Sequence, residues 1–170
     1  MNTLALVPVL ALLATTPAFA QEQATPSQIT ELYGDWTVSC STVDQERLCA
    51  MTQTLMESET SRHVLTLELS RSDAGPLDGM LVVPFGMDFS KGVTLSIEAE
   101  AIGPALPFLT CLPTGCLVPV SFGQPQADRL AAGATLTVTG HSADGLNAIP
   151  IGLSLAGFSE AAARLDQVSG

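Results

Sequence analysis

The sequence predicts an all-β domain, mainly antiparallel, that folds as a β-sandwich with a short helix before the last strands and a short C-terminal helix. Val, Ile, Leu and Thr recur in short alternating runs, and Gly and Pro residues break these runs at intervals typical of sandwich strands. The four cysteines are spaced so that two of them face each other across each of two expected hairpins. A body of about 140 residues is the size of one domain.

The first 20 residues have the pattern of a secretory signal peptide. An apolar run from Leu4 to Ala14 precedes a small-residue cleavage site that ends at Ala20, although the start of the chain lacks Lys and Arg. The run is too short to span a bilayer, and no later segment has the roughly 20 apolar residues that a span requires. We therefore expect a periplasmic or secreted product with no membrane span, with a flexible segment over 21–30 and one domain over 31–170.

About eight strands are expected from the alternation of apolar and polar residues. The clearest run is Leu65, Leu67 and Leu69, whose neighbours along the chain are polar, so that one face of the strand is apolar. Pro150 cannot donate to a ladder and therefore places the last strand at a sheet edge or beside a bulge. The predicted strands span 33–40, 47–56, 65–70, 79–84, 93–98, 116–121, 135–139 and 148–155.

Two short helices are predicted, over 125–132 and 160–167. Gly133 ends the first, and Ser159 is the expected N-cap of the second. The second helix is expected to cover one end of the sandwich. Its expected apolar stripe is Ala161, Leu165 and Val168, and its expected i,i+4 ion pair is Glu160 with Arg164.

The cysteines Cys40, Cys49, Cys111 and Cys116 are expected to form two disulfides, because an exported chain meets an oxidising compartment. Local pairing of Cys40 with Cys49 and of Cys111 with Cys116 is favoured over crossed pairing, which stays open. A turn centred between positions 44 and 45 places the first pair directly opposite, at a Cα separation of roughly 4.5–5.5 Å. The Pro-Thr-Gly turn before Cys116 does the same for the second pair.

The same register predicts part of the core. Trp36 and Val38 share a face with Cys40, and their expected partners across the hairpin are Gln53 and Met51. Trp36 and Met51 should therefore be buried, whereas a buried Gln53 would need a hydrogen-bond partner.

No metal or cofactor is expected. A four-cysteine zinc site usually has two to four residues between neighbouring ligands, whereas eight separate Cys40 from Cys49. A redox-active pair is disfavoured because the C-x-x-C motif is absent and no helix start follows the cysteines.

The formal net charge is −11, with six basic against seventeen acidic residues. Such a chain repels phosphate backbones and anionic lipids, so nucleic-acid binding is excluded. The expected partner is a protein or another envelope component.

Several motifs occur in a characteristic order: Gly34-Asp35-Trp36, the four cysteines, Met51, Pro84-Phe85-Gly86, Lys91-Gly92-Val93, and Ala156-Gly157-Phe158 before the terminal helix. Together they resemble the invasion-associated locus B family of exported bacterial proteins. The resemblance covers about residues 31 to 166 and depends on the order and spacing of the motifs. It implies a secreted or envelope-associated β-rich domain with structural disulfides, and some members are implicated in entry into host cells. It implies no catalytic residue and no cofactor.

The candidate catalytic residues have simpler structural interpretations. His63 and His141 lie in polar strand ends or turns, and the His-Ser-Ala-Asp run beginning at His141 does not by itself form a triad. The acidic residues Asp35, Glu98, Glu100 and Asp128 show no acid/base spacing. We therefore expect a binding protein and no enzyme. The alternatives are a small hydrolase with a site built from distant residues, and a metal or redox carrier that uses Met or Cys.

The segment around Phe85, Met87 and Phe89 is the candidate contact loop. Two aromatic residues and a methionine in a polar, glycine-containing loop indicate an exposed apolar surface that meets a partner. The alternative is a hairpin that turns the same side chains inward.

Overall fold

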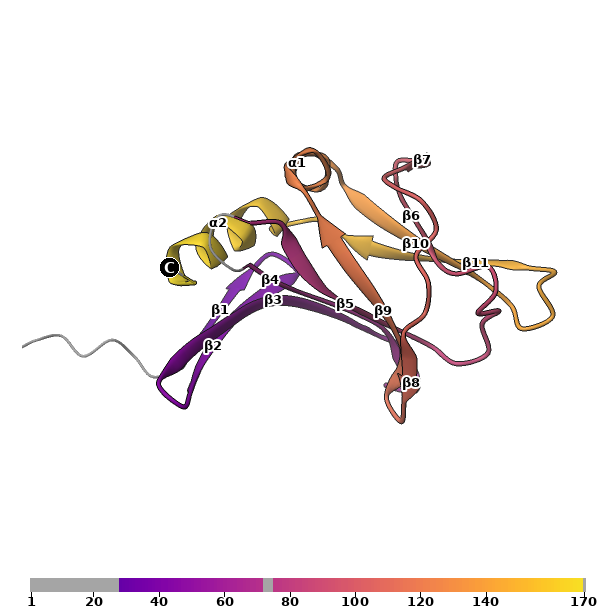
Figure 1. The fold of residues 1–170 in the computed structure, drawn as a ribbon, viewed down its shortest axis with the longest axis horizontal. Helices are drawn as coiled ribbons and strands as arrows, with labels where there is room; N and C mark the ends of the chain where they lie inside the picture. Colours follow the sequence, from indigo (N-terminus) through magenta and orange to yellow (C-terminus); the bar gives the residue numbers. More distant parts are fainter. Residues whose placement is uncertain (1–27, 72–74, 170) are drawn as a thin grey trace, which may run out of the picture.

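Two antiparallel sheets and two short helices make up the computed structural model, which describes residues 28–71 and 75–169 (Figure 1). The larger sheet has seven strands in the order β1-β2-β3-β4-β5-β9-β8, and the smaller has four in the order β11-β10-β6-β7. The predicted fold class is therefore confirmed. The expected signal peptide, and residues 21–27 of the expected flexible segment, lie outside the described residues.

The strands are β1 (Gln28–Tyr33), β2 (Trp36–Val43), β3 (Glu46–Met56), β4 (His63–Ser70), β5 (Leu77–Val83), β6 (Thr94–Ile97), β7 (Glu100–Ala101), β8 (Thr110–Leu112), β9 (Gly115–Phe122), β10 (Thr135–His141) and β11 (Ala148–Ser154). The helices are α1 (Gln124–Ala132) and α2 (Phe158–Val168).

The core lies between the inner faces of the two sheets and beneath α2. Alternation places Leu65, Leu67 and Leu69 of β4 fully inside. Trp36 and Met51 are also fully buried, as the register predicts. The strand with Pro150 is the edge of the smaller sheet, which agrees with the missing ladder donor.

The N-terminal strand is the main difference from the expected elements. Residues 28–30, expected to be flexible, belong to β1, which pairs with β2 along its whole length. The expected strand over 33–40 is interrupted by a turn at Gly34, whose φ of 56° suits glycine. The alternation of β1 is hidden in the sequence because a charged residue, Glu31, occupies an inward-facing position.

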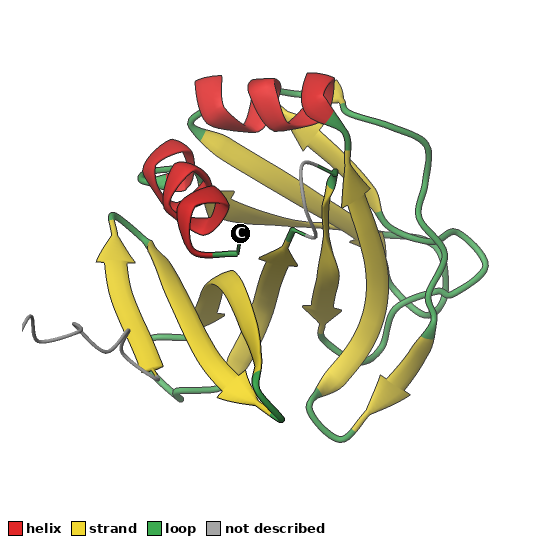
Figure 2. Cartoon of the chain, turned by 60° about the vertical axis from the view of Figure 1, so that its left-hand side comes forward, coloured by secondary structure: helices red, strands yellow, loops and turns green. Residues whose placement is uncertain are grey.

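Helix α2 packs against β1, β2 and β3 (Figure 2). Its expected stripe is buried, but the N-cap is Gly157 instead of Ser159. Gly157 has a φ of 86°, and a Cβ there would lie 2.0 Å from the Tyr33 carbonyl oxygen, so only glycine allows this approach.

The expected pair of Glu160 with Arg164 is wrong. Arg164 instead makes a two-pronged ion pair with Glu31 of β1, at 2.6 and 2.9 Å. The two carboxylate oxygens of Glu31 accept hydrogen bonds from two nitrogens of the Arg164 guanidinium, which is the bidentate geometry that arginine favours. The contact ties the last helix to the first strand.

Trp36 connects the first hairpin to the C-terminal part of the chain. Its ring meets Phe158 edge to face, with centroids 5.2 Å apart, and its Nε1 donates to the Ser154 carbonyl oxygen.

Gln53 is buried at 3% exposure, and its side-chain nitrogen donates to the Asp35 carbonyl oxygen. The amide nitrogen therefore has the partner that its burial requires, whereas the side-chain oxygen Oε1 is buried without a hydrogen-bond partner. Among the described residues, no helix has the length and apolar character needed to cross a membrane.

Candidate binding surface

Both disulfides join facing residues of neighbouring strands. Cys40 is bonded to Cys49 across β2 and β3, and Cys111 to Cys116 across β8 and β9. The Cα separations are 4.1 and 3.9 Å, somewhat shorter than the sequence-based expectation. All four sulfurs are therefore engaged in covalent cross-links, and no cysteine is free.

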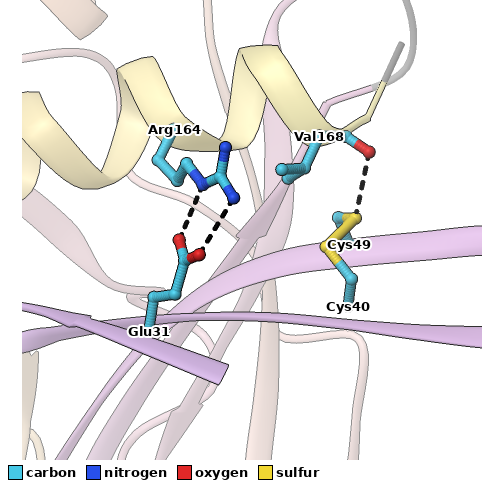
Figure 3. Close-up of a disulfide and its surroundings, with 5 residues drawn as sticks. All are labelled: Glu31, Cys40, Cys49, Arg164 and Val168. Atoms are coloured by element: carbon cyan, nitrogen blue, oxygen red, sulfur yellow. Dashed lines mark hydrogen bonds and ion pairs between the residues drawn. A yellow bond between two sulfur atoms is a disulfide. The ribbon is translucent and has the colours of Figure 1, made fainter. Parts of the chain in front are cut away.

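The first disulfide is buried beneath the end of α2 (Figure 3). The Cys49 Sγ lies 3.4 Å from the Val168 carbonyl oxygen. Since a disulfide sulfur carries no hydrogen, this is a close sulfur–oxygen contact and not a hydrogen bond. The packing points to a structural role for this cross-link.

The second disulfide borders a surface loop. Cys116 is the ladder partner of Val83, the last residue of β5, and the loop over 84–92 begins directly after it. Cys116 is buried at 1% exposure, whereas Cys111 is half-buried. The hairpin of β8 and β9 lies at the opposite end of the larger sheet from the turn of β2 and β3 (Figure 1).

Met87 anchors this loop instead of belonging to its outer surface. The sequence-based expectation grouped Met87 with two phenylalanines as a contact residue, but the side chain is only 5% exposed. It packs against Gly140 of β10, where a Cβ would lie 2.5 Å from the Met87 sulfur. The expected surface position of Met87 is therefore corrected, because the missing side chain at Gly140 provides space for it.

Phe85 and Phe89, on either side of the anchor, face outward. They are 60% and 53% exposed. Phe89 also stacks on Phe108, with ring centroids 4.5 Å apart and an interplanar angle of 28°. The Phe89 ring therefore packs on Phe108 with one face and remains partly open to solvent, so it is available for an apolar contact.

A second loop is fastened to the first. The Lys91 ammonium donates to the Gly145 carbonyl oxygen in the turn between β10 and β11, and the Asp88 backbone N–H donates to the His141 carbonyl oxygen. These bonds join two segments more than fifty residues apart in sequence. Local sequence patterns could not predict the contact of Lys91 with Gly145, because 54 residues separate them.

Two carboxylates hold the backbone of these loops. The Ser90 hydroxyl, its backbone N–H and nearby Lys91 lower the pKa of Asp88. The Ser142 hydroxyl and the Leu146 backbone N–H lower the pKa of Asp144. Both groups stay ionised at neutral pH and stabilise turns through local hydrogen bonds.

The loops expose further apolar side chains that the sequence-based reasoning did not identify. Leu109 is 63% exposed and Leu146 is 82% exposed. Single exposed leucines are ordinary, so only their position next to the phenylalanine loop singles them out. We call the set Phe85, Phe89, Phe108, Leu109 and Leu146 the aromatic end.

Several candidate catalytic groups take part in local hydrogen bonds or ion pairs. His63 exchanges a hydrogen bond with Thr66, 2.8 Å away. Ser142 binds Asp144 across its own turn, while the Nδ1 of neighbouring His141 is buried without a hydrogen-bond partner. Glu100 pairs with Arg129. Among residues 28–71 and 75–169, no group of three His, Cys, Asp or Glu side chains is arranged to hold a metal ion.

Comparison with known proteins gives a consistent set of relatives. A model of the family described as Invasion associated locus B (IalB) protein matches residues 36–166. Invasion protein B homologs from two Brucella abortus strains are each 40% identical to the chain over 143 residues, covering 84% of this chain and 82% of theirs. Invasion protein B of Bartonella bacilliformis is 32% identical over 126 residues, covering 74% of this chain and 67% of its own length.

A solved structure shares the fold. The crystal structure of invasion associated protein B from Bartonella henselae superposes with a TM-score of 0.75 at 30% sequence identity. The alignment covers 81% of this chain and 94% of that chain.

Proposed function

The chain belongs to the invasion-associated locus B family, and from that premise we propose that it is an exported, non-catalytic binding protein whose aromatic end contacts another protein or envelope component. Two disulfides support the export proposal, because such bonds persist in the periplasm and outside the cell. The relatives are named invasion proteins, which favours a partner met outside the cytoplasm.

The observation that carries the proposal is the exposure of two phenylalanines on a loop anchored by buried Met87 and by the Lys91 hydrogen bond. Met87 and Lys91 fix the loop from below and from the side, so Phe85 and Phe89 remain exposed without loss of local order. Aromatic residues are enriched at the centres of protein interfaces. Because the loop is already ordered, binding costs little conformational entropy.

The test compares a double variant with a matched control. Phe85→Ser combined with Phe89→Ser removes the aromatic surface, whereas Leu48→Ser removes a leucine of similar exposure, 51%, on β3. Purified wild type and both variants are used to capture partners from envelope extracts and from the culture medium. A specific partner retained by wild type and Leu48→Ser but lost by the double variant supports the proposal. Equal retention by all three proteins, or absence of any specific partner, contradicts it.

A further inference from the structure

Strand β1 is the one sheet edge in the described part of the chain that is longer than three residues and contains neither proline nor lysine. Three other strands also end a sheet there. Of these, β7 has two residues and β8 has three, and β11 carries Pro150 within its run. Short edges and proline are the usual protection against strand addition. In contrast, β1 has six residues, all paired with β2, and contains neither Pro nor Lys.

The backbone groups on the open side of β1 follow from the register. Val43 and Glu46 close a two-residue turn, so they form a hydrogen-bonded pair, and such pairs alternate along the ladder. Three steps away, Cys40 therefore directs its N–H and C=O away from β3 and towards its β1 partner, Ile29. The same alternation makes Thr30 and Leu32 direct their N–H and C=O outward.

The edge is held in place before any partner arrives. Glu31, the only charged residue of β1, is bound by the Arg164 guanidinium of α2 and by the Tyr33 hydroxyl. Its charge is therefore compensated and does not repel an incoming strand. The Asp35 N–H, just after β1, donates to the Ala156 carbonyl oxygen, so the end of the strand is fixed as well.

We propose that β1 accepts an extended, basic segment of another protein as an additional strand of the larger sheet. Leu32, which is 74% exposed beside this edge, gives the incoming strand an apolar contact. The net charge of −11 favours a basic partner over a second copy, since a second copy brings the same charge whereas Lys and Arg side chains are attracted. Four of the six basic residues are already in ion pairs with this chain's own carboxylates, so they offer little to an acidic partner.

The test uses a short synthetic peptide of alternating lysine with threonine or valine, and a control peptide with glutamate in place of lysine. Thr30→Pro removes an outward N–H without removing a bond to β2, and Thr30→Val is the matched variant that keeps this donor. Wild type and Thr30→Val should bind the lysine peptide, and more tightly than the glutamate peptide. Thr30→Pro should bind it at least about tenfold more weakly.

Hydrogen exchange of the wild type gives a second readout that needs no variant. The amides of Thr30 and Leu32 should exchange faster than those of Glu31 and Tyr33 in the free protein, and the lysine peptide should slow them selectively. Absence of binding, equal binding by Thr30→Pro, or protection confined to other segments would overturn the proposal. A wild-type dimer in sedimentation that Thr30→Pro abolishes would overturn the choice of partner.

The aromatic end is independent of this strand site. Phe85→Ser combined with Phe89→Ser should leave binding of the lysine peptide unchanged. Loss of peptide binding in that variant would move the site to the aromatic end and would overturn the assignment to β1.

Discussion

The two ends of the larger sheet contain similar features, which differ in their exposure to solvent. Each has a hairpin closed by a disulfide and a contact between two aromatic rings. At the α2 end, Cys40–Cys49 and the pair of Trp36 with Phe158 are buried. At the other end, Cys111 and Phe89 are partly open to solvent. The hairpin that α2 covers has its disulfide and its aromatic contact in the core, whereas the β8–β9 end leaves Cys111 and Phe89 partly exposed although Cys116 is buried.

The aromatic pairs should give the largest contrast in stability. Trp36→Ala removes a fully buried ring and its bond to Ser154, and should lower the free energy of unfolding by about 3–5 kcal/mol. Phe89→Ala removes a half-exposed ring and should cost less than about 1 kcal/mol. Urea unfolding of both variants measures the difference. Similar costs would contradict the contrast between a core end and a surface end.

The disulfides should differ less. In the chain-entropy model, loops of this size give each bond about 2–3 kcal/mol, with little difference between them. Replacing Cys40 and Cys49 together by alanine also leaves a gap beneath α2, so this double variant should melt at a lower temperature than the corresponding Cys111 and Cys116 variant. The reverse order of melting temperatures would show that the covered bond is not the more important one.

Acid should destabilise the two ends to different extents, because Glu31 binds a partner far away in the sequence whereas Asp144 binds residues of its own turn. Arg164 and, secondarily, Tyr33 lower the pKa of Glu31 from its ordinary value of 4.5. A carboxyl whose pKa is depressed by folding stabilises the protein above its unfolded pKa, and this stabilisation is lost as the pH falls through the folded pKa. The contribution of Glu31 should therefore be complete near neutrality and decline below about pH 4.5.

Two substitutions test this pH dependence. Glu31→Gln should flatten the acid side of the plot of melting temperature against pH, because Glu31 joins β1 to α2 across 133 residues. Asp144→Asn should change that plot less, since Asp144 binds residues within its own turn. This is the smallest of the expected effects, because exposed ion pairs contribute little. A steeper acid dependence in Glu31→Gln would contradict the assigned sign.

The sequence predicts features that depend on near neighbours. Alternation identifies the inner face of β4, and turn geometry alone places Cys40 opposite Cys49 and Trp36 in the core. Strand β1 is not predicted, because its inward-facing Glu31 finds its partner 133 residues away. The inward orientation of Met87 is hidden for the same reason, since it depends on a glycine in a distant strand.

Burial of the Cys40–Cys49 bond under the last turn of α2 implies an order of assembly. A chain that emerges N-terminus first presents both thiols to an oxidant long before the eleven residues of α2 follow. Once the helix has docked, the Val168 carbonyl lies against Cys49 and thiol exchange loses its access. We therefore expect this pair to oxidise faster before α2 docks than after it, so that docking of the C-terminal helix protects the bond.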